Sequence, residues 1–202
     1  MNFLTDFPIT TALIAANLAA SFYAFSNRDF YEQNLFRVGN VTKGNEWHRV
    51  VTSGFLHVDP MHLLFNMYAL YLFGRILEQV LGPAGYLIVY FGSLLGASAW
   101  MLWDKRRQLN YSAVGASGAV SGIILSFCLF APLAQLSFFF IPMPAIVFGA
   151  AYIGISLYLS QRQNAIIAHG AHLGGALAGL VLTALVEPRS ITAFLGAFGI
   201  GT

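Results

Sequence analysis

Polar residues that could perform chemistry occur inside three of the chain's apolar stretches. They are His57, His62 and Asn66 in the first stretch, Ser117 and Ser121 in the second, and His169 and His172 in the third. A serine is a weak nucleophile until a base removes its proton, and histidine titrates near neutral pH. The pattern therefore predicts a nucleophile and its general base, with Ser117 and His172 in these roles.

No carboxylate is available in the sequence nearby to orient this histidine. Between Lys105 and Glu187 there is neither aspartate nor glutamate, so we expect a Ser-His dyad rather than a triad. Acyl transfer also needs hydrogen-bond donors for the oxyanion that develops on the attacked carbonyl. His62 and Asn66 are four residues apart and share one face of a helix. We expect both to donate to the oxyanion, together with the backbone amide of Ser117.

Small residues accompany both members of the dyad. Gly118 and Gly122 form a small-xxx-small pair, which lets a neighbouring helix backbone approach closely. The histidine lies on a stripe with the spacing i, i+3, i+4 and i+7, formed by His172, Gly175, Ala176 and Gly179. Close packing of the two helices suits direct contact between histidine and serine. Ser121, four residues after Ser117, shares its face of the helix.

The composition indicates that this site lies in a membrane. Apolar residues make up 57% of the 202 residues and charged residues only 9%, whereas a soluble domain carries about 25% charge. Ten basic and eight acidic residues nearly cancel, so no nucleic-acid partner is expected. The single cysteine, Cys128, excludes an intramolecular disulfide. The lipid bilayer is therefore the expected solvent.

Six stretches are long and apolar enough to cross a bilayer as helices. They cover residues 8–25, 57–77, 84–103, 113–131, 141–159 and 166–186, and the segment 26–56 is expected to be a folded loop in the interface. The sequence thus predicts an all-α, polytopic, single-domain bundle over residues 1–202. The second, fourth and sixth spans run parallel, so their polar residues gather at one depth near the 26–56 side.

Simpler interpretations exist for each polar residue alone. A serine in a membrane helix commonly bonds to its own backbone carbonyls. His169 and His172, three residues apart, could form half of a metal site with His57 or His62. No H-E-x-x-H motif and no nearby carboxylate completes such a site, so we expect neither metal nor cofactor. The structural interpretations would have to hold independently in three helices, which favours catalysis.

Three motifs resemble those of the rhomboid intramembrane serine proteases. They are His57-x4-His62-x3-Asn66, Gly115-Ala-Ser-Gly118 and Gly170-Ala-His-Leu-Gly-Gly175, and the resemblance covers residues 46–186 in the family's order. It implies that Ser117 is the nucleophile, His172 its base, and His62 and Asn66 the lining of the oxyanion pocket, with Gly115 two residues before the nucleophile. The family cleaves peptide bonds at or near transmembrane segments of other membrane proteins, without metal or cofactor.

The resemblance also assigns supporting parts and shows two departures. Residues 26–56 match the family's membrane-embedded first loop, residues 160–166 its cap, and Glu78 a position that ties helix ends together. Arg49 fits the family's Trp-Arg pair, but the aromatic Trp47 is one residue out of register. Where many bacterial members have a tyrosine stacked on the catalytic histidine, this chain has Ser121. The orientation of His172 is therefore expected to depend on other contacts.

The family topology predicts a bacterial inner (plasma) membrane protein with both termini in the cytoplasm. The inside would then hold only Arg75 and Arg189, and the other eight basic residues would lie outside, against the positive-inside rule. Two other functions remain open from the sequence. One is a non-catalytic rhomboid-like protein that binds transmembrane helices. The other is a small transporter that uses its histidines as a proton relay.

Overall fold

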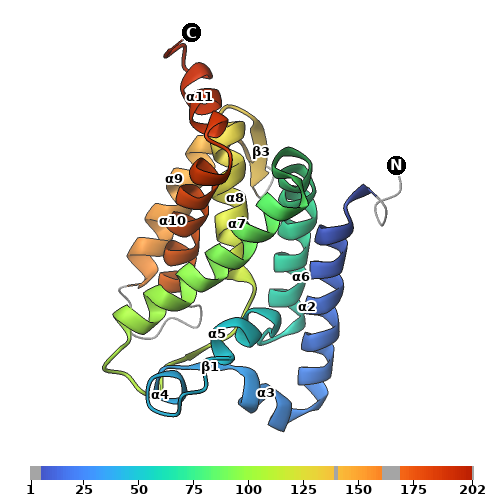
Figure 1. Cartoon of the computed structure of the whole chain (residues 1–202), viewed down its shortest axis with the longest axis vertical. Coiled ribbons are helices and arrows are strands. Elements are labelled where there is room, and N and C mark those ends of the chain that lie inside the picture. Colours follow the sequence, from blue (N-terminus) through green and yellow to red (C-terminus); the bar gives the residue numbers. More distant parts are fainter. Residues whose placement is uncertain (1–5, 139–140, 161–168, 202) are drawn as a thin grey trace.

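The computed structural model describes residues 6–138, 141–160 and 169–201. The larger helices are α2 (Pro8–Ser26), α6 (Pro60–Ala69), α7 (Arg75–Asp104), α8 (Ser117–Phe130), α9 (Ala145–Ser160), α10 (His169–Val186) and α11 (Arg189–Gly196). A π-helical turn, η2 (Leu70–Gly74), joins α6 to α7. In Figure 1 helix α11 and the start of α2 lie towards the top, and the elements between α2 and α6 lie at the bottom.

The all-α prediction holds for most of the chain and is wrong at two short antiparallel strand pairs. Strand β1 (Phe36–Arg37) pairs with β2 (Ser112–Ala113), and β3 (Gln135–Phe138) pairs with β4 (Ile141–Pro144). The span expected over 113–131 begins late, because 112–113 belong to β2 and helix α8 starts at Ser117. The span expected from 141 likewise starts at Ala145, after β4.

Helix ends follow local sequence signals. Asp59 caps α6 by accepting a hydrogen bond from the His62 amide, and Pro60 occupies the first turn, so this helix begins three residues after the expected start at 57. Gly82 has φ +67° and interrupts α7 before Pro83, where the sequence predicts a break. In Figure 1 the chain rises through α6 and returns downward through α7.

Helix length alone identifies few complete spans within the described residues. Helix α2 and the run Pro60–Asp104 are long and apolar enough to cross a membrane, and α10 with α11 would be a third if this pair, bent by 105°, is one span. Helix α8 and the stretch Ala145–Gly154 of α9 are apolar but shorter. The count of six spans therefore stays a prediction.

The segment between α2 and α6 is folded. It contains α3 (Arg28–Asn34), β1, α4 (Val38–Thr42), α5 (Arg49–Thr52) and the 3-10 turn η1 (Ser53–Phe55). The buried Arg49 holds it together, because its guanidinium donates to the carbonyl oxygens of Glu32 (2.7 Å) and Leu35 (2.8 Å) and pairs with Glu46 (2.6 Å). This residue thus organises the loop from which β1 reaches β2.

Glu78, in the first turn of α7, joins the N-terminal ends of α7 and α2. Its carboxylate accepts hydrogen bonds from the amides of Ile9 (2.9 Å) and Thr10 (2.8 Å), in the first turn of α2, and from the Thr10 hydroxyl (2.7 Å). A carboxylate at a helix N-terminus satisfies free amides and complements the helix dipole. The contact is the kind of helix-end tie that the resemblance implies for this position.

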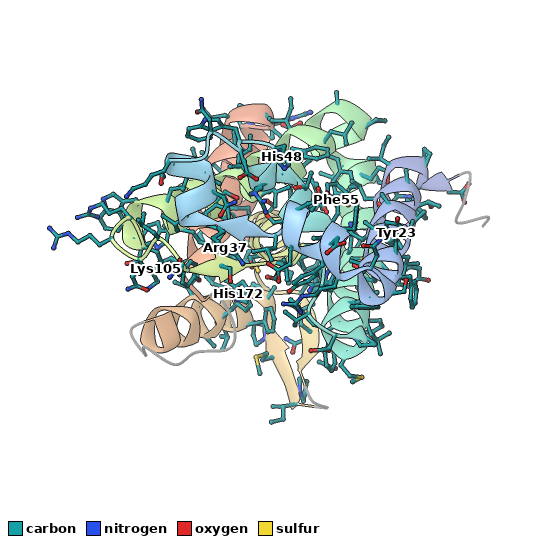
Figure 2. The ribbon with its side chains drawn as sticks, turned by 90° about the horizontal axis from the view of Figure 1, so that it is seen from below. Tyr23, Arg37, His48, Phe55, Lys105 and His172 are labelled. Atoms are coloured by element: carbon teal, nitrogen blue, oxygen red, sulfur yellow. The ribbon has the colours of Figure 1, made fainter. Side chains whose placement is uncertain are left out.

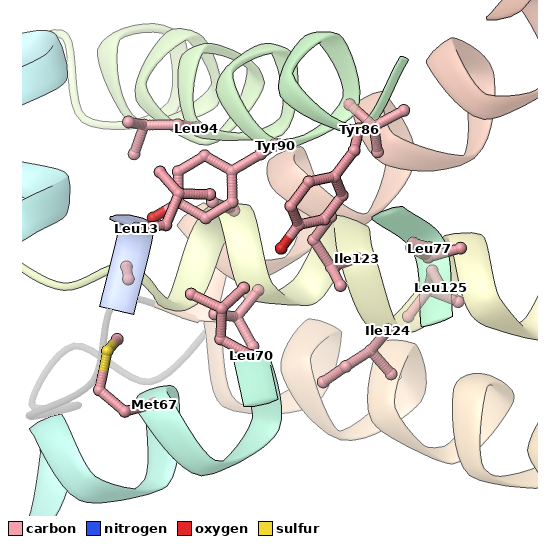
Figure 3. Packing of buried hydrophobic residues seen from close by; sticks show 14 of the residues in the cluster. Leu13, Met67, Leu70, Leu77, Tyr86, Tyr90, Leu94, Ile123, Ile124 and Leu125 are labelled. Atoms are coloured by element: carbon pink, nitrogen blue, oxygen red, sulfur yellow. The ribbon is translucent and has the colours of Figure 1, made fainter. Parts of the chain in front are cut away.

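The core lies where α7, α8 and α10 meet η2 and α2. Figure 3 shows Tyr86 and Tyr90 reaching from α7 towards Leu70 and Ile123, all fully buried. Helix α10 contacts α8 through glycine backbones. A Cβ atom on Gly175 would fall 2.7 Å from the carbonyl carbon of Gly118, so the two helices touch where neither has a side chain. This contact lies one helical turn from His172.

Candidate active site

The backbone turn before α8 presents Ser117 at the first position of that helix. Gly115 has φ +132°, a conformation that favours glycine, and the chain enters the helix two residues later. The first loop holds this turn: the Gly115 amide donates to the carbonyl oxygen of Ser53 (3.0 Å), and β2 just upstream pairs with β1. As the first helical residue, Ser117 has an amide that no intrahelical carbonyl can use. That amide is free to bind an anion.

Ser117 and His172 are in direct contact. The distance from His172 Nε2 to Ser117 Oγ is 2.8 Å, within hydrogen-bonding range. The serine comes from α8 and the histidine from the first turns of α10, 55 residues later in the chain. The glycine contact between Gly118 and Gly175 brings the two helices close enough for this bond. Figure 2, seen from the loop end, shows His172 near the middle of the view.

His62 lies against the same turn. A Cβ atom on Gly115 would fall 2.7 Å from His62 Cε1 and 3.5 Å from Ser117 Oγ, so glycine leaves room for the imidazole beside the serine. His62 Nδ1 is buried and has no hydrogen-bond partner among the described residues. Asn66, one turn further along α6, donates through Nδ2 to the His62 carbonyl oxygen (3.0 Å). The Nδ2 amino group carries a second hydrogen, which it can donate to another acceptor.

Tyr152 on α9 is a site residue that the sequence reasoning missed. Its ring stacks on that of His172, with centroids 6.0 Å apart and planes 22° apart. Its hydroxyl lies 2.5 Å from Ser121 Oγ, and Ser121 Oγ also donates to the Ser117 carbonyl oxygen at 2.5 Å. Ser121 therefore supports the site through Tyr152. The only sequence signal was the unmet need for a contact that orients His172.

His57 is engaged on both ring nitrogens. The Ala116 amide donates to Nε2 (3.5 Å), so in the neutral ring Nδ1 carries the proton and donates to Ser21 Oγ (2.9 Å). The Ser21 hydroxyl in turn donates to the Phe55 carbonyl oxygen (3.0 Å). This arrangement leaves His57 no lone pair for a metal, and it anchors the residue before Ser117.

Two further features of the site are a cavity beside the serine and the absence of a cluster of metal ligands among the described residues. A small open cavity adjoins Ser117 and is lined partly by Ser53, Ser98 and Gly115. Within residues 6–138, 141–160 and 169–201, no three His, Cys, Asp or Glu residues lie close enough to share a metal ion. The side chain of His169 and nearly all of the expected cap at 160–166 fall outside the described part of the chain.

These features define a helical membrane protein with a serine and a histidine in contact between two helices. Residues 44–189 match the family model described as the Rhomboid domain, so the chain belongs to the rhomboid family and is an integral membrane protein. It is 30% identical over 201 residues to RHOMBOID-like protein 12, mitochondrial, of Arabidopsis thaliana, covering 91% of this chain and 60% of that protein.

Two further relatives come from a bacterium and a yeast. The putative rhomboid protease YdcA of Bacillus subtilis is 35% identical over 129 residues, which cover 60% of this chain and 62% of that protein. Rhomboid protein 1, mitochondrial, of Saccharomyces cerevisiae is 30% identical over 143 residues, 65% of this chain and 40% of that protein. The chain thus spans less than two thirds of the length of these relatives, which include proteins named as proteases and proteins named only as rhomboid-like.

Proposed function

We propose that this protein is an intramembrane serine endopeptidase that cleaves transmembrane segments of other membrane proteins. The observation that carries the proposal is the 2.8 Å contact between Ser117 Oγ and His172 Nε2, at the N-terminus of α8. Two partly buried polar side chains in contact inside an apolar bundle are a functional hypothesis by default. The membership of the rhomboid family, which includes serine proteases, supports the same assignment.

The proposed reaction uses the two residues in sequence. His172 Nε2 accepts the Ser117 proton as Oγ forms a bond to the scissile carbonyl carbon. The oxyanion is held by the Ser117 amide, by His62, and by the second amino hydrogen of Asn66, whose first hydrogen is donated to the His62 carbonyl oxygen. The C–N bond then breaks, and the imidazolium gives its proton to the leaving amine. Water hydrolyses the acyl-enzyme with His172 again acting as base.

The same proposal includes the arrangement in the membrane. We assign one domain with six spans, in which α8 and α9 are short spans and α10 carries the base. The candidate site lies towards the end that bears the first loop, from which water would reach it (Figure 1). A bacterial inner (plasma) membrane is the proposed location; among the relatives, one comes from a bacterium and two are named as mitochondrial.

Cleavage of a reporter transmembrane substrate in proteoliposomes tests the function. Wild type should cleave, and Ser117→Ala and His172→Ala should each abolish cleavage, because the dyad acts as a unit. Ser126→Ala is the matched control: it removes a buried hydroxyl on the same helix that bonds to Gly122 and Thr183, and it should retain activity.

A serine-directed fluorophosphonate probe provides a second measurement. The probe should label wild type at Ser117 alone, and the His172→Ala variant should label far more slowly. A wild type that neither labels nor cleaves any of several reporters would refute the protease assignment. That result would make the protein a non-catalytic member that binds transmembrane helices.

A further inference from the structure

Tyr152 packs against the face of the His172 ring, the proposed base of the dyad. A dyad has no carboxylate to fix its imidazole, yet His172 must hold Nε2 on Ser117 Oγ for proton transfer. Tyr152 lies on α9, a helix that carries neither member of the dyad, and its ring is stacked on His172. The centroid separation of 6.0 Å is typical of offset-stacked rings.

The tyrosine is itself fixed in position. Its hydroxyl meets Ser121 Oγ at 2.5 Å, and Ser121 is bonded at 2.5 Å to the carbonyl oxygen of Ser117. A closed circuit therefore runs from Ser117 Oγ through His172, Tyr152 and Ser121 back to the backbone of Ser117. Each contact in the circuit restrains the next, so the imidazole plane is coupled to the position of its own nucleophile.

Phe148 extends the aromatic row on the same helix face. Its ring stacks on Tyr152 with centroids 6.2 Å apart and planes 27° apart, and it lies one turn before Tyr152 on α9. The hydroxyl bond and this second ring restrain Tyr152 from two directions. Tyr152 is thus held in its rotamer more firmly than a lone ring at a helix surface would be.

We propose that Tyr152 is the positioning residue of the dyad: its ring fixes the plane of the His172 imidazole, and Ser121 fixes the ring through the tyrosine hydroxyl. This inference rests on the proposed function of Ser117 and His172. It assigns Ser121 a role through Tyr152 rather than a direct role in catalysis. It also makes the geometry of the dyad depend on the packing of α9 against α8 and α10.

Three single variants and one double variant of the 202-residue chain in proteoliposomes separate the ring from its anchor. Tyr152→Leu removes the ring and should lower kcat roughly ten- to a hundredfold with KM unchanged, because a misplaced base costs rate rather than substrate binding. Tyr152→Phe and Ser121→Ala each remove the same hydroxyl contact. Each should lower kcat about two- to tenfold, and the double variant should fall no further than either single one.

Rates are divided by the concentration of sites that the fluorophosphonate probe titrates, so that misfolded protein does not count. Ile153→Ala is the matched control, because it removes packing from the next residue of α9, on a different face of that helix. A purely structural role for Tyr152 predicts a lower unfolding temperature with an unchanged kcat per titrated site. That result, or independent and multiplicative losses for Tyr152→Phe and Ser121→Ala, would overturn the proposal.

NMR titration of the His172 ring, in protein labelled at histidine, provides a readout that needs no activity. Tyr152→Leu should shift the midpoint of this titration and broaden the ring signals, whereas Ile153→Ala should leave both unchanged. An unaltered His172 titration in Tyr152→Leu overturns the positioning role. Failure of the protease assignment is recognised separately, by a wild type that neither cleaves nor labels.

Discussion

Gly175→Ala offers a direct test of the idea that backbone contact sets the distance within the dyad. The new methyl carbon would fall 2.7 Å from the Gly118 carbonyl carbon, whereas carbon atoms pack best at about 3.5–4.0 Å. The α8–α10 separation must therefore widen by about 1 Å. Because His172 lies on the preceding turn of α10, its distance to Ser117 Oγ would rise from 2.8 Å beyond hydrogen-bonding range.

The expected loss follows from that displacement. A misplacement of about 1 Å at a catalytic group costs on the order of a hundredfold in rate, or about 2.7 kcal/mol in the activation barrier. The assay is single-turnover cleavage in proteoliposomes, at a temperature below the unfolding transition of both proteins. Overpacking should also lower the unfolding free energy by about 1–3 kcal/mol.

Gly154→Ala is the control, since within the described part of the chain no atom beyond its own stretch of helix lies within 4 Å of the added Cβ. It should leave kcat unchanged and stabilise α9 slightly, because alanine is the better helix former. A Gly175→Ala protein that cleaves within about threefold of the wild-type rate would refute the reasoning. The distance within the dyad would then be set by something other than the glycine contact.

Three further predictions concern the elements that support the site. Glu78→Gln leaves the amides of α2 with one acceptor oxygen in place of a carboxylate. It should lower the unfolding free energy, measured by denaturant titration, by about 1.5–3 kcal/mol. The kcat should be unchanged at denaturant concentrations below the unfolding transition. Arg49→Lys keeps the charge but loses the planar guanidinium, whose Nη1 reaches two carbonyl oxygens while Nε and Nη2 bind Glu46. The thermal midpoint should therefore fall, and an unchanged midpoint would contradict this role. The hydrogen bond from Arg49 holds the pKa of Glu46 below its ordinary value of 4.5. The folding stability that this pair contributes is therefore present above pH 4.5 and is lost as the pH falls through the pKa of the folded state. Glu46→Gln should therefore lower the thermal midpoint at pH 7 but make no difference at a pH below that value, and a difference that is independent of pH would exclude the ion pair as its cause.

Much of the helical layout could be predicted from the sequence because bilayer solvation imposes a simple rule. Apolar stretches of sufficient length must be helices, and the helix over 8–25 follows from this rule. The break at Gly82-Pro83 falls in the gap between the expected stretches 57–77 and 84–103. The contact between Ser117 and His172 was also predictable. Both lie near the start of even-numbered expected spans, which run parallel, so they should be at one depth, and glycines let their two helices pack closely. Their catalytic roles remain predictions.

The features that the sequence did not reveal all depend on tertiary contacts. Strands β1 and β2 are two residues each and pair across more than seventy positions, so no periodicity indicates them. Helix α8 starts late because the pairing of Ser112 and the conformation of Gly115 keep the preceding chain extended. Tyr152 has no motif of its own. Its position over His172 follows from the way α9 packs, which a pattern within one helix cannot express.

The shortness of α8 has a consequence for the products of the proposed reaction. Its 14 residues span about 21 Å, so with its C-terminal end at one boundary of a 30 Å hydrocarbon core, Ser117 lies about 9 Å below the other. A substrate helix is then cut about six residues inside its own apolar stretch. One fragment is released with a short apolar end, which is small enough to remain soluble in water. The other keeps about fourteen apolar residues, too few to cross the bilayer, and it must tilt, thin the surrounding lipid or find a partner.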